Sequence, residues 1–199
     1  MKLAGALLLS FILSACTPLG VVAGAGASVG LAAVQEGGIK TAAKDTMIEL
    51  KIADAWAKYN FDMFRKLDMT VKEGRVLITG SVSDPDMRVE AVRLAWKVDG
   101  VNQVLNEIMV DDNEAVTALL TDSIITGSIR TKIMFDKHIR SINYNVDTAN
   151  GNVYLMGIAK DQEELDLVID YARNTNLVTN VVNYVRLSKQ DVRVKPNNR

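Results

Sequence analysis

The sequence predicts an α+β fold built from two tandem units of one design. Three observations support this prediction. The 199-residue chain is 48% hydrophobic and 24% charged, which is ordinary globular usage. Residues 46–108 align with residues 123–185 without a gap, so the sequence contains an internal repeat. Within each copy, helical spacing of apolar residues is followed by strand-like alternation and then by helical spacing again.

The aligned copies share identical residues at turns and in apolar stretches. The identical pairs are Ile52/Ile129, Gly74/Gly151, Val76/Val153, Gly80/Gly157, Asp84/Asp161, Ala95/Ala172, Val101/Val178, Val104/Val181 and Asn106/Asn183. Apolar character is kept at further aligned positions, which indicates that both copies fold alike.

The first unit is expected to span residues 46–110 and to begin with a helix at Asp45-Thr46. Thr46 and Glu49 have the spacing of a capping box, and Ile48 and Ile52 fall on one helical face. A β-hairpin follows, in which residues 67–71 and 76–78 alternate on either side of a turn at Gly74.

A second helix and a last strand complete the first unit. Asp84-Pro85 is a favourable helix start, because proline suits the first helical position. Ala91, Val92 and Ala95 form the inner face of this helix. Gly100 ends the helix, and residues 101–110 are predicted to form one strand.

The second unit, residues 123–187, repeats this order. Asn150-Gly151 is a strong hairpin turn, Asp161 and Glu164 cap the second helix, and residues 178–187 supply the last strand. Each unit is expected to be a three-stranded mixed sheet covered by two helices, in αββαβ order. A unit of about 65 residues buries little apolar surface, so its stability is marginal. Docking of the two units would therefore stabilise both. Residues 111–122 are expected to be a linker and residues 188–199 a disordered tail.

The N-terminal residues have the pattern of a lipoprotein signal. Lys2 precedes an apolar run over residues 3–13, which is too short to span a bilayer. Ser14 and Ala15 precede Cys16, and this arrangement resembles the bacterial lipobox, in which the cysteine thiol takes the lipid. We therefore expect a signal peptide over residues 1–15 and lipidation of Cys16.

Residues 16–45 are expected to form a small-residue tether, although the glycine spacing within them also permits a packing helix. The residue after the cysteine is Thr17 and not aspartate. In bacterial lipoproteins this implies the outer membrane, with the protein facing the periplasm.

Two stretches around the turns resemble the BON domain family: residues 71–80 with 98–108, and residues 150–157. The resemblance covers both units and implies that the chain binds phospholipid surfaces and supports envelope integrity. In outer-membrane members, the first helix of the second unit contacts lipid, partly through a tryptophan. Ile124 stands at that position, so the aromatic anchor is absent here.

The first helix of the second unit is also basic and carries apolar residues. Residues 124–142 contain four basic residues against one acid, whereas residues 161–172 contain five acids and no base. Basic residues near an anionic membrane each contribute about 1 kcal/mol. The expected phospholipid-binding residues are Ile124, Ser128, Arg130, Thr131, Lys132 and Phe135. An alternative is a protein-interaction module that docks an outer-membrane assembly or division partner.

Little in the sequence supports catalysis. His138 is the one histidine and is expected in an exposed loop or helix C-cap, and Cys16 would be acylated. The acids over residues 161–170 have the spacing of a solvated helix face. We expect no enzyme, cofactor, metal or small-molecule substrate. The net charge of −1 also argues against nucleic acid as a partner.

Overall fold

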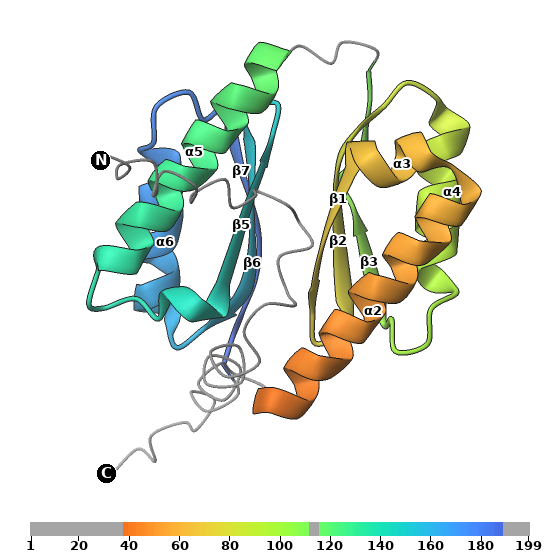
Figure 1. Cartoon of the computed structure of the whole chain (residues 1–199). Coiled ribbons are helices and arrows are strands. Elements are labelled where there is room, and N and C mark those ends of the chain that lie inside the picture. The colour runs from red at the N-terminus through yellow and green to blue at the C-terminus, as the bar shows by residue number, and fades with distance from the viewer. Residues whose placement is uncertain (1–37, 112–115, 189–199) are drawn as a thin grey trace, which may run out of the picture.

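The computed structural model describes residues 38–111 and 116–188, which form two α+β units joined face to face (Figure 1). The sheets of the two units face each other, and the helices cover the outer sides (Figure 1). The predicted signal peptide, Cys16 and most of the predicted tether lie outside the described residues, as does the tail beyond Ser188.

The first unit has the predicted order, with a short additional helix. Its elements are α2 (Gly38–Tyr59), α3 (Phe61–Lys66), β1 (Leu67–Lys72), β2 (Arg75–Val82), α4 (Pro85–Trp96), β3 (Gln103–Asn106) and β4 (Met109–Val110). Strand β2 lies between β1, which is antiparallel to it, and β3 with β4, which are parallel to it. The sheet is therefore mixed, as predicted.

The second unit repeats this arrangement. Its elements are α5 (Val116–Phe135), the 3-10 helix η1 (Ser141–Asn143), β5 (Tyr144–Ala149), β6 (Asn152–Ala159), α6 (Gln162–Arg173) and β7 (Asn180–Leu187). Strand β6 is antiparallel to β5 and parallel to β7. The predicted αββαβ order is thus confirmed for both units. Between its first helix and its first strand, the second unit has η1 where the first unit has α3.

The predicted start of the first helix is wrong. Helix α2 begins at Gly38, so Thr46 lies inside the helix and its hydroxyl donates to the Ala42 carbonyl, 3.0 Å away. Glu49 does not cap the helix but accepts a hydrogen bond from the Val71 amide on β1. The capping-box spacing was a coincidence, because Thr46 bonds within α2 and Glu49 binds β1.

Two further boundaries differ from the prediction. The last strand of the first unit is divided into β3 and β4, and Ile108 between them is buried in the core. Helix α5 begins at Val116, inside the stretch expected to be a linker. In the second unit, β7 is continuous from Asn180 and begins two residues later than predicted.

Each unit has its own core between its helices and its sheet. In the first, Ile48, Ile52 and Trp56 of α2 are buried against β1 and β2. In the second, Ile125, Ile129 and Ile133 of α5 occupy the aligned positions. The inner faces predicted for α4 and α6 are also found, with Ala91, Ala95, Leu165, Val168 and Ala172 buried.

The repeated residues have repeated structural roles. Gly74 and Gly151 occupy the same position in the two hairpin turns, with φ of 72° and 76°. In each unit an aspartate near the start of the first helix accepts hydrogen bonds from two turn amides. Asp45 receives the amides of residues 73 and 74 at 2.8 and 2.9 Å, and Asp122 receives those of residues 150 and 151 at 2.7 and 2.8 Å.

Other identical pairs begin a helix or protect a sheet edge. Asp84 and Asp161 are the N-caps of α4 and α6, and their side chains accept hydrogen bonds from helix amides. Asn106 and Asn183 each accept the backbone amide two residues further along the outer strand. Both bonds lie at the same place in the repeat, beside the outer strand of each sheet.

The two sheets pack through equivalent positions. Leu77 and Tyr154, which are aligned in the repeat, lie in one buried cluster with Met156. The Thr70 hydroxyl donates to the Asp147 carboxylate at 2.9 Å, and these positions are also aligned, 77 residues apart. Contacts between equivalent residues are the mark of twofold symmetry. The units therefore associate like the subunits of a symmetric dimer within one chain.

Candidate functional site

The side of α5 that faces away from the core carries no charged side chain. Residues three, four and seven positions apart share one face of an α-helix. The face opposite the buried isoleucines consists of Leu120, Ile124, Ser128, Thr131 and Phe135. We call these five residues the α5 ridge.

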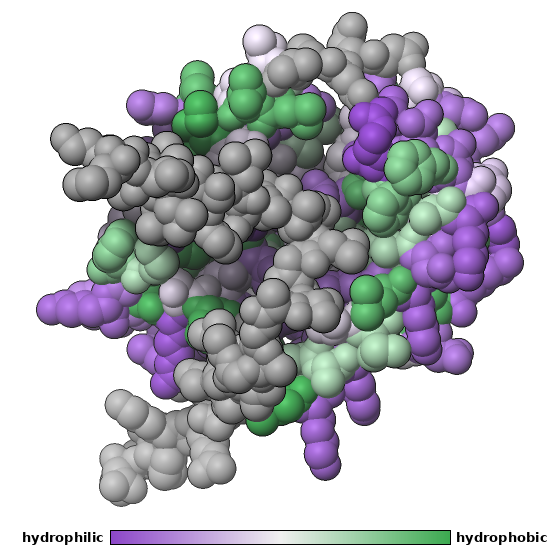
Figure 2. All heavy atoms as spheres, viewed as in Figure 1, coloured by the Kyte–Doolittle hydropathy of each residue, from purple (hydrophilic) through white to green (hydrophobic). Residues whose placement is uncertain are grey.

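The apolar members of the α5 ridge are open to solvent. Leu120, Ile124 and Phe135 are 61%, 64% and 79% exposed, and Leu119 and Met134 beside them are 64% and 60% exposed. Figure 2 shows hydrophobic side chains gathered over the N-terminal end of α5, at the top of the view. Exposed apolar side chains gathered in this way are typical of a site that binds a protein or a membrane.

Helix α2 shows that the fold does not require this surface. The α2 residues aligned with Ile124, Ser128, Thr131 and Phe135 are Met47, Lys51, Asp54 and Lys58. Lys58 and Asp54 form an ion pair on the α2 surface with a separation of 2.6 Å. Two helices with matching buried faces therefore have different outer faces, and only that of α5 lacks charge.

The two predicted basic residues lie on opposite flanks of the α5 ridge. Arg130 points toward the sheet, where its guanidinium donates to the Val146 carbonyl at 2.7 Å and lies 3.7 Å from the Asp147 carboxylate. Lys132 points toward α6, where its ammonium donates to the Thr175 hydroxyl at 2.7 Å. The structure thus brings together Ile124, Ser128, Thr131 and Phe135, but it separates the two cations.

Sequence reasoning missed the apolar residues at the start of α5. Leu119 and Leu120 fall within residues expected to form a linker. Met134 has no apolar residue three or four positions before it, so helical spacing did not mark it as part of an apolar face. A signal was present, because residues 115–120 are largely apolar and such residues are unusual in an exposed linker. Met134 could have been found from helical spacing, because it does not share the helix face of the buried isoleucines.

The acidic side of the second unit is only partly a solvated helix face. Glu163, Asp166 and Asp170 are exposed on α6, as expected. Glu164 is 1% exposed, and its carboxylate accepts hydrogen bonds from the amides of Arg140 and Lys160. Its predicted place in a solvated face is wrong, because it fixes the connection into α6.

His138 lies on the surface after α5, where its ring is 3.1 Å from the Asp136 carboxylate. The backbone amide of His138 and the Tyr171 hydroxyl also donate to Asp136, and these bonds lower the pKa of that carboxyl. Among the described residues, no three His, Cys, Asp or Glu side chains form a group suited to a metal ion. No helix in residues 38–111 or 116–188 has the length and apolar character to cross a membrane.

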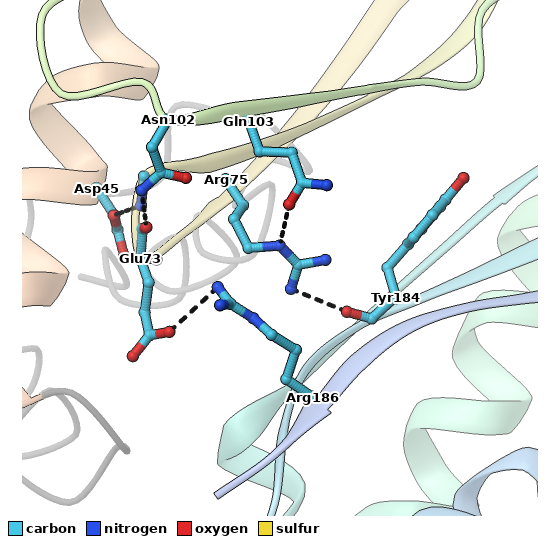
Figure 3. A network of polar contacts seen from close by, with 8 residues as sticks. Asp45, Glu73, Arg75, Asn102, Gln103, Tyr184 and Arg186 are labelled. Carbon is cyan, nitrogen blue, oxygen red and sulfur yellow. Dashed lines mark hydrogen bonds and ion pairs between the residues drawn. The ribbon is translucent and has the colours of Figure 1, made fainter. Parts of the chain in front are cut away.

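A polar network joins the two sheets at the end opposite the start of α5 (Figure 3). Arg75 donates to Gln103 on its own sheet at 2.9 Å and to the Tyr184 carbonyl of the other sheet at 3.0 Å. Arg186 pairs with Glu73 at 3.3 Å. Burial, followed by the nearby Arg186 charge, lowers the pKa of Arg75. These contacts between the two sheets help to fix how the units dock.

Comparison with known proteins identifies relatives across both units. The BON domain family matches residues 44–112 and again residues 121–189. A protein of Anaplasma centrale, described as an uncharacterized protein in the gshII 5' region, is 40% identical over 136 residues. That match covers 68% of this chain and 90% of the other.

Two further relatives have descriptive names. Outer membrane lipoprotein DolP of Haemophilus influenzae is 28% identical over 182 residues, which are 91% of this chain and 93% of that protein. Osmotically-inducible protein Y of Escherichia coli is 28% identical over 143 residues, which are 70% of each chain.

Proposed function

This chain belongs to the BON domain family, and from that premise we propose that it is an envelope protein that binds anionic phospholipid through the α5 ridge. Its role is binding and not catalysis, and it supports the integrity of the envelope. The similarity to an outer membrane lipoprotein over 91% of the chain supports this location. One observation carries the proposal: the outer face of α5 is apolar and uncharged, whereas the outer face of α2 is charged.

The ridge can enter the interfacial region of a bilayer while its flanks stay in water. Ile124 and Phe135 lie three turns apart on one line, so both can insert when the helix lies flat on the surface. Full burial of such a side chain contributes about 1.5–3 kcal/mol. Arg130 and Lys132 on the two flanks can then approach phosphate groups, each adding about 1 kcal/mol.

Vesicle co-sedimentation tests this proposal. Residues 17–199 contain every described residue and lack Cys16, so binding does not depend on acylation. We expect them to bind phosphatidylglycerol-containing vesicles better than purely phosphatidylcholine vesicles. Ile124→Ser with Phe135→Ser should weaken binding at least about tenfold, since each 1.4 kcal/mol is a factor of ten.

The matched control is Met47→Ser with Leu50→Ser, which removes two exposed apolar side chains from α2. This variant should bind vesicles like the parent protein. Equal binding by the α5 variant and the α2 variant would contradict the proposal.

The flanking charges Arg130 and Lys132 should be needed for binding to anionic vesicles. Arg130→Glu with Lys132→Glu is expected to abolish binding to anionic vesicles at moderate salt, while circular dichroism stays unchanged. Attraction between exposed charges is screened by salt, so the parent should also bind less tightly as salt rises. Equal binding by this variant and the parent at low salt would remove electrostatic attraction from the account.

We also propose that Cys16 is acylated, which would hold the protein at the outer membrane on its periplasmic side. A lipid anchor raises the local concentration of the α5 ridge at the bilayer, so weak attraction by the ridge suffices. Cys16→Ala should release the protein from membranes or leave it as an unprocessed precursor. Incorporation of labelled palmitate into the Cys16→Ala protein would refute acylation at this residue.

A second candidate function is docking of an outer-membrane assembly or division protein on α6. The observation that favours it is the exposed acidic row Glu163, Asp166 and Asp170. At the last two aligned positions, α4 carries Val89 and Arg93, so the fold does not require acids there. If the α6 row is the functional surface, Asp166→Asn with Asp170→Asn will impair envelope integrity in cells while vesicle binding stays intact.

A further inference from the structure

Helix α2 carries three exposed lysines on one side. Lys40, Lys44 and Lys51 follow one another at intervals of four and seven residues, so they share one line along the helix. The two acids among them point inward, where Asp45 accepts the amides of the hairpin turn and Glu49 accepts an amide of β1. We call the three lysines the α2 row, and its positive charge faces solvent.

Helix α6 carries a line of the opposite charge. Glu163, Asp166 and Asp170 are three and seven residues apart and exposed, and they lie opposite the side of α6 that buries Val168 and Ala172. We call these three acids the α6 row. The described part of the chain forms no ion pair with any of them, so their charge is available to a partner.

The repeat shows that the fold requires neither row. At the same offset of 77 residues, the positions of the α2 row are occupied in α5 by uncharged residues, which are Thr117, Thr121 and Ser128. The positions of the α6 row are occupied in α4 by one acid, one apolar residue and one base, which are Asp86, Val89 and Arg93. Each unit therefore has one strongly charged helix, and the two helices have opposite signs.

The two rows lie on opposite sides of the molecule. Helix α2 belongs to the outer helical layer of the first unit and α6 to that of the second, with both sheets between them (Figure 1). One molecule therefore cannot bring its own two rows together. Two molecules can do so, if α2 of one is laid against α6 of the next.

The spacing within the two rows also matches. Lys40 and Lys44 are four residues apart, as are Asp166 and Asp170, and four residues of an α-helix rise about 6 Å. The outer acids of the α6 row are seven residues apart, as are Lys44 and Lys51, and this spacing corresponds to about 10.5 Å. When the two helices lie side by side, at least two carboxylates can therefore face two ammonium groups at once.

Apolar side chains border both rows. Met47 is exposed and lies one helical turn from both Lys44 and Lys51. On α6, the half-buried Leu167 precedes Asp170 by three residues and so borders the α6 row. An exposed ion pair alone contributes little to association, so burial of these apolar groups would add to the attraction between the charges.

We propose that this chain associates head to tail with a second copy of itself, through the α2 row of one molecule and the α6 row of the next. Complementary charge on opposite sides of one chain favours this partner over an unlike protein at the α6 row. Such a contact leaves one row free at each end, so it extends into a line of molecules unless a ring closes. The contact does not depend on membrane binding by the α5 ridge.

Sedimentation equilibrium of residues 17–199 without lipid tests the contact. The average mass should rise with protein concentration at low salt and return to that of one chain at high salt, because salt screens exposed charges. Lys44→Glu with Lys51→Glu should weaken association at least about tenfold, because two attractive pairs become repulsive. Asp166→Lys with Asp170→Lys should weaken it to a similar degree. Both variants should keep the parent's circular dichroism.

The matched control is Arg88→Glu with Lys137→Glu, which changes the net charge as the α2 variant does, at exposed positions outside α2 and α6. This control should associate like the parent. A mixture of the α2 variant and the α6 variant gives the sharpest test. The reversed row of each variant is complementary to the unchanged row of the other, so the mixture should associate although neither variant does so alone.

Three results would overturn the proposal. The first is a parent protein that remains a single chain at low salt, and the second is equal association by the control and the two reversed variants. The third is a mixture that does not associate, which would show that the two rows do not contact each other. If the parent remains a single chain and the α2 variant loses binding to phosphatidylglycerol vesicles, the α2 row serves the membrane instead.

Discussion

Helices α2 and α5 occupy the same place in their units and differ on the side that the core does not use. Both bury residues at the same three aligned positions, which are Ile48, Ile52 and Trp56 in α2 and isoleucines in α5. Their outer faces are charged in α2 and uncharged in α5. Because the fold is common to both, it does not require the difference in outer face, and the proposed membrane binding would account for that difference.

The same comparison separates structural residues from functional ones elsewhere. Asp45 and Asp122 bind the two hairpin turns in the same way, so these aspartates belong to the fold. Asp68, by contrast, is aligned with Asn145, so its charge is special to one unit. Changes at the shared turn positions should affect stability in both units, whereas changes on the outer face of α5 should affect binding.

The largest effect on stability is expected from the shared turn aspartates. Asp45→Ala or Asp122→Ala leaves two turn amides without their charged acceptor, and each variant should lower the free energy of unfolding by about 2–4 kcal/mol. Urea unfolding followed by circular dichroism measures this loss. A large loss in one variant with none in the other would break the equivalence of the two turns.

A smaller effect is expected from the turn glycines, and here the two units should differ. A residue with a side chain strains a backbone with positive φ by roughly 1–2 kcal/mol. A Cβ atom at Gly74 would also lie 2.5 Å from the Gly100 carbonyl oxygen, whereas at Gly151 its nearest contact is 3.1 Å, to the Thr179 hydroxyl.

Gly74→Ala should therefore cost about 2–3 kcal/mol and Gly151→Ala about 1–2 kcal/mol in unfolding free energy. The midpoints of urea denaturation give the comparison directly. The reverse order would show that the two turns do not relax in the same way.

The smallest effect concerns Asp68, whose pKa burial raises. The folded state then holds the proton more tightly than the unfolded state, so the ionised carboxylate lowers stability at neutral pH. This loss disappears as the pH falls through the raised pKa toward the ordinary value of about 4. Asp68→Asn, which introduces the residue aligned in the other unit, should stabilise the protein slightly at about pH 8 and not at about pH 4.

Unfolding of this variant at the two pH values is the measurement, with Asp99→Asn at an exposed position as the control. A stability gain for Asp68→Asn that is the same at both pH values would show that its ionisation is not the cause.

Much of the fold could be predicted because its signals are local and occur twice. The glycine turn, the N-cap before a helix and the apolar helical spacing each depend on a few neighbouring residues. Asp84 with Pro85 and Asn150 with Gly151 specified an element boundary without any distant partner. Because the sequence repeats, the prediction of an element in one unit was strengthened by the same prediction at the aligned residues of the other unit.

The errors arose where a distant contact decided the outcome. Thr46 and Glu49 satisfy a local capping rule, but Glu49 accepts the Val71 amide and the helix starts earlier. Lys132 is basic, but its sequence neighbours do not show where it points; its ammonium donates to Thr175, just beyond the C-terminal end of α6. The hydrogen bond from Thr70 to Asp147 joins the two units, so no local sequence pattern indicates it.

Exchanging the outer face of α5 for that of α2 tests the central claim most directly. Ser128→Lys, Thr131→Asp and Phe135→Lys place the α2 residues at the aligned positions, and the fold should persist because α2 already carries them. The exchange raises the net charge by one, so attraction by charge alone would strengthen binding to anionic vesicles. We predict instead that co-sedimentation with phosphatidylglycerol vesicles falls at least about tenfold, because the exposed Phe135 is removed and charged side chains would have to enter the bilayer beside Ile124. Binding equal to or tighter than that of the parent, with an unchanged unfolding midpoint, would contradict the claim that the α5 ridge binds the membrane.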